Sequence, residues 1–238
     1  MSIFAEINAN LQKGRSKAVC NLVNDALAQN LDPKDIMQAM LDGMAEIGEK
    51  FKRDEVFVPD VMISARAMNN GIAILKPHLA GAGIETVGKA CVGTVKGDLH
   101  DIGKNLVKLM LEGRGFEVID LGVDVAPETF VKTAIEQNCS IIGCSALLTT
   151  TMGAMGEVVR LAEEAGIRDK VKIMVGGAPV DQRFCDTIGA DTYTRDAASA
   201  ADAAVAHMGK KSMSINANQG LHAINSYNSL PPSLREVA

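Results

Sequence analysis

Short β-rich runs alternate strictly with helix-like segments from Lys89 onward, and this alternation restricts the possible folds more than any other feature. The β-rich runs are residues 90–95, 116–120, 140–144, 171–175 and 191–193. The helix-like segments lie near residues 103–113, 127–137, 152–165, 180–187 and 196–208. Such alternation predicts an α/β fold, a parallel sheet with helices on both faces. Five strands favour the flavodoxin-like (Rossmann-type) doubly wound order, in which ligands bind beyond the carboxyl ends of the strands.

The chain before this region has a helical pattern throughout. In its third segment Ile36, Met40 and Met44 recur at a spacing of four, as one apolar helix face requires. Asp32 before Pro33 is typical of a helix start, with an N-cap followed by proline at the first helical position. Four such segments predict a four-helix bundle; the other three lie near residues 3–12, 15–29 and 61–75.

These patterns divide the chain into three parts. We expect a helical domain over residues 1–85, an α/β domain over 86–209 and an extension over 210–238 with no assigned role. Gly81-Ala82-Gly83 marks a flexible break between the two domains. The extension is rich in Ser and Asn, which indicates a loosely ordered segment or one that lies over another surface.

Composition and charge exclude several classes of partner. The 238 residues carry a formal net charge of −5 and contain no basic block, so neither nucleic acid nor an anionic membrane surface is expected as a partner. The first residues lack the apolar core of a secretory signal, and no apolar run is long enough to span a bilayer. The five cysteines include no CxxC pair, which favours reduced thiols over disulfides or a zinc site. We therefore expect a cytoplasmic protein.

Three loops that follow predicted strands are rich in small and hydrogen-bonding residues. They are residues 97–103, 145–151 and 176–179, after the first, third and fourth strands. Because the carboxyl ends of parallel strands meet at one edge of the sheet, we expect the three loops to form a single site.

The first of these loops does not match the common phosphate or metal motifs. The interval from Gly97 to Gly103 is one residue too long for a P-loop, and Lys104 is not followed by Ser or Thr. The loop also lacks the G-x-G-x-x-G of a dinucleotide site. Asp98, His100 and Asp101 alone would provide too few ligands for a zinc or iron site.

Taken together, the three loops resemble the cobalamin-binding motif D-x-H-x-x-G … S-x-L … G-G. The matching residues, in chain order, are Asp98, His100, Gly103, Ser145, Leu147, Gly176 and Gly177. The segment before them, with Pro59-Asp60-Val61, resembles the helical cap that precedes this domain. The likeness covers roughly residues 1–209. The proteins that it resembles are the corrinoid proteins of cobalamin-dependent methyltransferase systems and the cobalamin region of methionine synthase.

The resemblance implies roles for three residues around the cobalt. In this family the cofactor's own base leaves cobalt and a histidine takes the axial position, the base-off/His-on state, so His100 would be the metal ligand. Asp98 would hold the other imidazole nitrogen. Thr151 stands where the family generally has Ser and would complete the proton relay.

The resemblance also implies which residues contact the rest of the cofactor. Ser145 and Thr149 would lie near the buried tail, and Gly176 and Gly177 would leave room for its base. The full set of expected cofactor-binding residues is His100, Asp101, Gly103, Ser145, Leu147, Thr149, Gly176 and Gly177.

Methionines invite a cofactor role because the family's cap closes apolar side chains over the upper corrin face. Met37, Met40 and Met44 are nonetheless expected in the bundle core. Met62 and Met68, in the segment that resembles the cap helix, are the better candidates to cover the corrin.

The function implied is that of a methyl-carrier subunit rather than a complete enzyme. Cobalt would accept a methyl group as Co(I) from a substrate-specific methyltransferase and deliver it from methyl-Co(III) to a second methyltransferase. The donor would be of the methanol, methylamine, methoxyaromatic or betaine type, and the acceptor tetrahydrofolate or coenzyme M. A reductive activase is a further partner that the resemblance suggests. The alternatives are a cobalamin-dependent sensor, a mutase subunit and a flavodoxin-like module without cobalamin.

Overall fold

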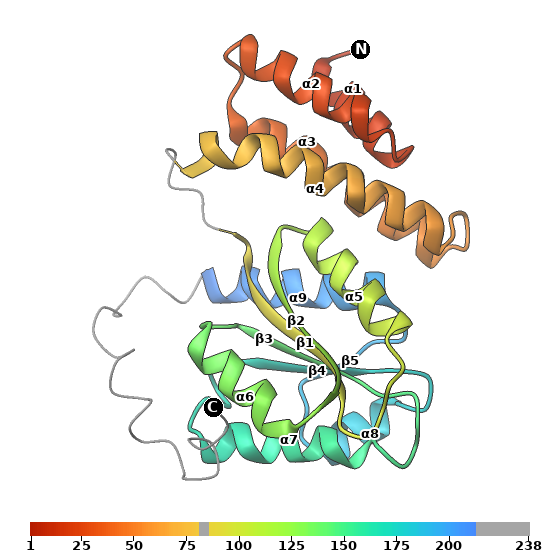
Figure 1. Ribbon diagram of the computed structural model, residues 1–238, viewed down its shortest axis with the longest axis vertical. Coiled ribbons are helices and arrows are strands. Elements are labelled where there is room, and N and C mark those ends of the chain that lie inside the picture. The colour runs from red at the N-terminus through yellow and green to blue at the C-terminus, as the bar shows by residue number, and fades with distance from the viewer. Residues whose placement is uncertain (81–85, 213–238) are drawn as a thin grey trace. The chain divides into compact units, whose positions relative to one another are not determined.

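The computed structural model describes residues 1–80 and 86–212 (Figure 1). The chain forms two compact units. One comprises Met1–Val87 with Leu109–Glu117, and the other comprises Gly88–Lys108 with the chain from Val118 onward. The predicted break at Gly81-Ala82-Gly83 lies outside the described residues, and so does the predicted extension from residue 213 on.

Four helices account for most of the first unit: α1 (Ile3–Gln12), α2 (Ser16–Ala28), α3 (Pro33–Lys52) and α4 (Val58–Ala80). Helix α3 begins as predicted, because the Asp32 carboxylate accepts a hydrogen bond from the Lys34 amide at 2.8 Å. Helix α4 is longer than predicted. It has a proline in its first turn, where no N–H donor is needed, and it continues past Pro77.

The methionines of the helical unit fall into two groups. Met40 and Met44 are buried and Met37 packs against them from a half-buried position, which confirms that these residues belong to the bundle core. Met68 is also fully buried in this core, whereas Met62 is 52% exposed. Of the two methionines expected to cover a cofactor, only Met62 therefore has a side chain at the surface of its own unit.

A five-stranded sheet, most of which belongs to the second unit, has the order β2-β1-β3-β4-β5, which confirms the flavodoxin-like topology. Its strands are β1 (Gly88–Val95), β2 (Phe116–Val125), β3 (Ile141–Ser145), β4 (Lys172–Gly176) and β5 (Thr192–Tyr193). The connecting helices are α5 (Ile102–Gly113), α6 (Pro127–Glu136), α7 (Gly153–Glu164) and α8 (Gln182–Thr187), and α9 (Ala197–Ser212) follows the last strand.

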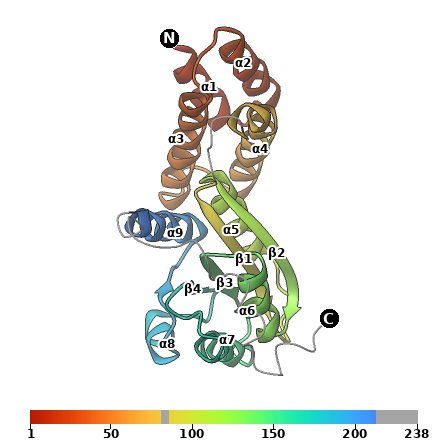
Figure 2. The same ribbon diagram turned by 90° about the vertical axis from the view of Figure 1, so that its left-hand side faces the viewer.

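Helices cover both faces of this sheet. Helices α6, α7 and α8 lie on one face, and α9 lies on the other together with the start of α5 (Figure 2). Phe130, Ile142 and Ile173 are fully buried in the core between the sheet and its helices. Across the three central strands Thr94 pairs with Ser145, and Ser145 pairs with Gly176. This register places the ends of β1, β3 and β4 in one row, from which the three predicted loops emerge.

Strand β2 extends to Val125, five residues beyond its predicted end at Asp120. The extension contains Gly122, which has a left-handed φ of 85°, and two exposed residues, Val123 and Asp124, so its burial pattern is not typical of a strand.

None of the helices in the described part of the chain is both long and apolar enough to cross a membrane.

Candidate functional site

The loop between β1 and α5 presents one histidine on a buried carboxylate. Asp98 is fully buried, whereas the His100 side chain is 53% exposed. The Asp98 Oδ1 atom lies 2.7 Å from His100 Nδ1 and also accepts the His100 backbone N–H at 3.1 Å. Because an ionised carboxylate only accepts hydrogen bonds, Nδ1 carries the imidazole proton. The lone pair of Nε2 is then available to a ligand.

The second oxygen of Asp98 joins this loop to the loop after β3. Asp98 Oδ2 accepts the backbone N–H groups of Leu147 at 2.7 Å and Leu148 at 3.1 Å. The Thr151 hydroxyl lies 3.2 Å from the same oxygen and 2.9 Å from the Leu148 carbonyl, so its single proton has two acceptors. Segments about 50 residues apart in the sequence therefore meet on one carboxylate.

The pKa of Asp98 follows from this arrangement. Burial acts to raise the pKa of the carboxyl, but hydrogen bonds from the Leu147 amide, the His100 ring and amide, and the Leu148 amide outweigh it. The net result holds the pKa of Asp98 well below its usual range. Asp98 is thus a fixed negative charge behind His100.

Replacing Asp98 with asparagine is expected to lower the free energy of unfolding of the apoprotein by about 2 kcal/mol at pH 7, because the amide NH₂ would face donors. The depressed pKa means that the carboxylate stabilises the fold fully above about pH 4 and loses this effect as the pH falls toward the folded pKa. The difference between the wild type and Asp98→Asn, measured by urea unfolding, should therefore shrink below about pH 4. Asp101→Asn, at an exposed neighbour, is the control. An equal difference at pH 7 and pH 3 would contradict the assignment.

Asp101 and Gly103 lie at the start of α5. Asp101 accepts one hydrogen bond from the Asn105 backbone amide at its carbonyl oxygen (2.8 Å) and one from the Asn105 side-chain amide at its carboxylate (3.0 Å). A Cβ atom on Gly103 would meet no heavy atom within 4 Å. Packing within the protein therefore does not explain why this exposed position is glycine.

The two glycines at the end of β4, Gly176 and Gly177, differ from each other. Gly177 has a φ of 126°, and a Cβ atom there would lie 1.8 Å from the Ala146 carbonyl oxygen. A Cβ atom on Gly176 would meet only the Thr194 carbonyl oxygen, at an ordinary 3.5 Å. Gly177 is therefore required by the protein's own backbone, a reason different from the predicted room for a cofactor base.

The other predicted residues also lie at this edge of the sheet. Ser145 is half-buried at the end of β3, and Thr149 is exposed in the loop that follows. Two residues that sequence reasoning missed hold the first loop in place. Asp124, at a left-handed φ of 54°, accepts the Gly97 amide at 2.7 Å and donates its own amide to the Asp98 carbonyl at 3.0 Å. Thr94 donates from its hydroxyl to the His100 carbonyl at 2.8 Å.

Exposed apolar side chains surround the histidine. In the described part of the α/β unit, the large apolar side chains that are clearly exposed are Leu99, Ile102, Val123, Leu147 and Leu148. Leu99 and Ile102 are 72% and 77% exposed, although they flank His100 closely in sequence. Such a cluster around one polar group indicates a binding surface for a large ligand that is mostly apolar.

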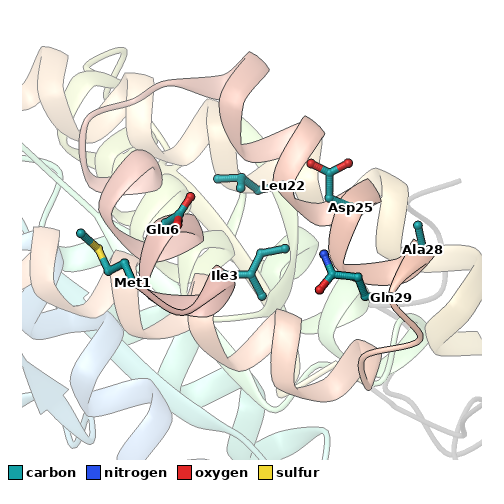
Figure 3. Close-up of a pocket in the computed structure, with 7 residues that line it drawn as sticks. All are labelled: Met1, Ile3, Glu6, Leu22, Asp25, Ala28 and Gln29. Carbon is teal, nitrogen blue, oxygen red and sulfur yellow. The ribbon is translucent and has the colours of Figure 1, made fainter.

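The described residues hold no group of three or more His, Cys, Asp and Glu side chains that could bind a metal ion. The helical unit has a groove of its own, and none of the predicted site residues lines it. It is lined by residues of α1 and α2, among them Glu6 and Asp25, together with Met1 and Gln29 (Figure 3).

Comparison with known protein families identifies the cofactor of the chain. Residues 88–206 match the model of a B12 binding domain, and residues 3–76 match a second B12 binding domain model. The chain belongs to the B12-binding corrinoid proteins. This membership confirms cobalamin as the cofactor expected from the three loops.

Relatives of this corrinoid protein match most of its length. A corrinoid protein of Desulfitobacterium hafniense is 42% identical over 88% of this chain and 99% of its own. Dimethylamine corrinoid protein 2 of Methanosarcina mazei is 42% identical over 83% of this chain and 93% of its own. Among solved structures, a chain of the methanol:cobalamin methyltransferase complex of Methanosarcina barkeri is 32% identical. It has a TM-score of 0.78 and covers 87% of this chain and 80% of that one.

Proposed function

We propose that this corrinoid protein is a methyl carrier in which His100 Nε2 is the lower axial ligand of cobalt, with the cofactor in the base-off/His-on state. The observation that carries the proposal is the half-exposed imidazole, held at Nδ1 by a fully buried carboxylate at 2.7 Å. A carboxylate behind a histidine fixes its tautomer and raises its strength as a metal ligand.

The surroundings of His100 fit a corrin. The exposed side chains of Leu99, Ile102, Leu147 and Leu148 would be covered by a broad apolar ring system, and this burial would favour binding. The open space at Gly103 would let the corrin approach the backbone closely. In this proposal the contacts to the cofactor come from His100, Asp101, Gly103, Ser145, Leu147, Thr149, Gly176 and Gly177.

Bound cobalamin supplies a cobalt centre that accepts a methyl group from a donor and gives it to a nucleophile. The residues of the chain control the axial base. An imidazole protonated at both nitrogens cannot be a ligand, so a proton on His100 Nε2 would release it from the metal. Asp98 would stabilise the resulting imidazolium, and the Thr151 hydroxyl, bound to the other carboxylate oxygen, would help to stabilise the negative charge of Asp98.

The proposed partners are methyltransferases. The names of the relatives include a dimethylamine corrinoid protein and a methanol:cobalamin methyltransferase complex, which supports a substrate-specific methyltransferase as one partner. A second methyltransferase would pass the methyl group to tetrahydrofolate or coenzyme M, and a reductive activase would restore the cofactor. Because relatives with different donors match most of the chain, the donor is left open among methanol, methylamine, methoxyaromatic and betaine types.

A cytoplasmic location is part of the proposal. The five cysteines are all reduced thiols, and four of them are buried, which suits a reducing compartment. Burial raises the pKa of the Cys144 thiol to about 12, so this thiol is protonated and unreactive near neutral pH.

The test is reconstitution followed by methylation. Apoprotein refolded with hydroxocobalamin should keep about one corrinoid per chain through gel filtration. The reduced holoprotein, mixed with candidate methyltransferases and their donors, should then show the spectrum of a methylated corrinoid. Complete loss of cofactor on the column would overturn the proposal. Tight binding without methylation by any donor class would favour the sensor alternative.

A further inference from the structure

Strand β1 ends next to the proposed ligand, and its Thr94 contacts that residue directly. Thr94 is fully buried, and its hydroxyl donates to the His100 backbone carbonyl at 2.8 Å. This hydrogen bond thus links the end of β1 to the loop that contains Asp98 and His100. The sequence pattern marks Thr94 only as a strand residue.

This contact differs from the others that hold His100. The ring and the amide of His100 are both held by Asp98, a residue of the same loop that is itself bound to the loop after β3. Thr94 instead belongs to a strand that pairs with β3 on one side and neighbours β2 on the other. Its partner in the register is Ser145, whose own partner is Gly176. Thr94 therefore ties the His100 carbonyl directly to a paired inner strand of the sheet.

We propose that Thr94 is a positioning residue of the corrinoid site, which fixes the His100 carbonyl to the sheet and so sets how strongly the imidazole holds cobalt. The inference rests on the proposed ligand role of His100. Without the hydroxyl, the His100 peptide would be free to rotate while its ring stays on Asp98. The Nε2 atom would then spend less time in line with the metal.

The experiment compares Thr94→Val with the wild type after reconstitution with hydroxocobalamin. Cyanide displaces an axial nitrogen base from cobalt, and the spectrum shows the displacement directly. A loosened histidine should be displaced at a cyanide concentration about three- to tenfold lower, which corresponds to the loss of one hydrogen bond. Both proteins should still retain about one corrinoid per chain.

Three further variants make the result specific. Thr94→Ser keeps the hydroxyl and should restore the wild-type cyanide concentration. Thr192→Val, on the edge strand β5 of the same sheet, should leave it unchanged. Should Thr94→Val not fold, Thr94→Cys replaces the hydroxyl with a much weaker donor of similar size and should show the same direction of change.

The outcomes separate this inference from the proposed function. If the wild type retains no corrinoid, or holds cobalt through a nitrogen that is not from histidine, the proposed ligand is wrong and the role of Thr94 falls with it. If the wild type is coordinated by histidine and Thr94→Val needs as much cyanide as the wild type, only the role of Thr94 is wrong. A Thr94→Ser protein that behaves like Thr94→Val would also overturn it.

Discussion

Replacing His100 with alanine is expected to remove the axial histidine nitrogen from cobalt and to slow methyl transfer by about 100-fold or more. The imidazole of His100 is half-exposed at this edge of the sheet. Its Nδ1 atom is bound to Asp98, and its Nε2 atom is available to a ligand. Loss of a residue that only supports a metal ligand already costs roughly 10- to 100-fold, so loss of the ligand itself should cost at least as much.

Isotope labelling shows whether the axial nitrogen on cobalt comes from histidine. The Co(II) form of wild-type protein labelled with ¹⁵N-histidine should show doublet splitting in its electron paramagnetic resonance spectrum, whereas a cofactor base would give the ¹⁴N triplet. The labelled His100→Ala protein should lose the doublet. His78→Ala, at an exposed position of α4, is the matched control and should keep it. A triplet in the labelled wild type would remove His100 as the ligand.

Replacing Gly177 with alanine is expected to destabilise the apoprotein by about 3–5 kcal/mol, from backbone strain and overpacking together. The added Cβ atom would lie 1.8 Å from the Ala146 carbonyl oxygen, at a φ of 126° that L residues rarely adopt. Relief of this contact would have to move the backbone next to Leu147, whose amide binds Asp98. Corrinoid retention should therefore fall together with stability.

Gly176→Ala is the matched control for this prediction. Its Cβ atom would make only an ordinary contact of 3.5 Å, so the free energy of unfolding should change by less than about 1 kcal/mol. Urea unfolding followed by circular dichroism gives both free energies of unfolding, and gel filtration of the Gly177→Ala protein gives its retained corrinoid. A Gly177→Ala protein as stable as Gly176→Ala would show that the close approach to Ala146 is not required.

Much of the fold could be predicted from the sequence because its signals are local. The apolar spacing of Ile36, Met40 and Met44 identified α3, and its start at Asp32 and Pro33 was also correct. Local signals failed where a segment does not show the usual pattern. The end of β2 is exposed and contains Gly122, so five of its residues were missed.

The candidate site was predicted in part for the same reason. Asp98 and His100 are two residues apart, and their contact follows from one short loop. The bond from the Thr151 hydroxyl to Asp98 was expected only through a family resemblance, and the structure brings the two atoms to 3.2 Å. The amides of Leu147 and Leu148 carry no signal in the sequence, since every residue but proline has one.

The sequence by itself determined the order of helices and strands, the three loops and the histidine, since each is encoded within one short segment. Only the tertiary structure decided that Gly177 makes room for the Ala146 carbonyl, and that Thr94 and Asp124 hold the loop of His100. These contacts join residues from different strands or from opposite ends of a loop. They depend on strand register and backbone path, which no local pattern of residue types specifies.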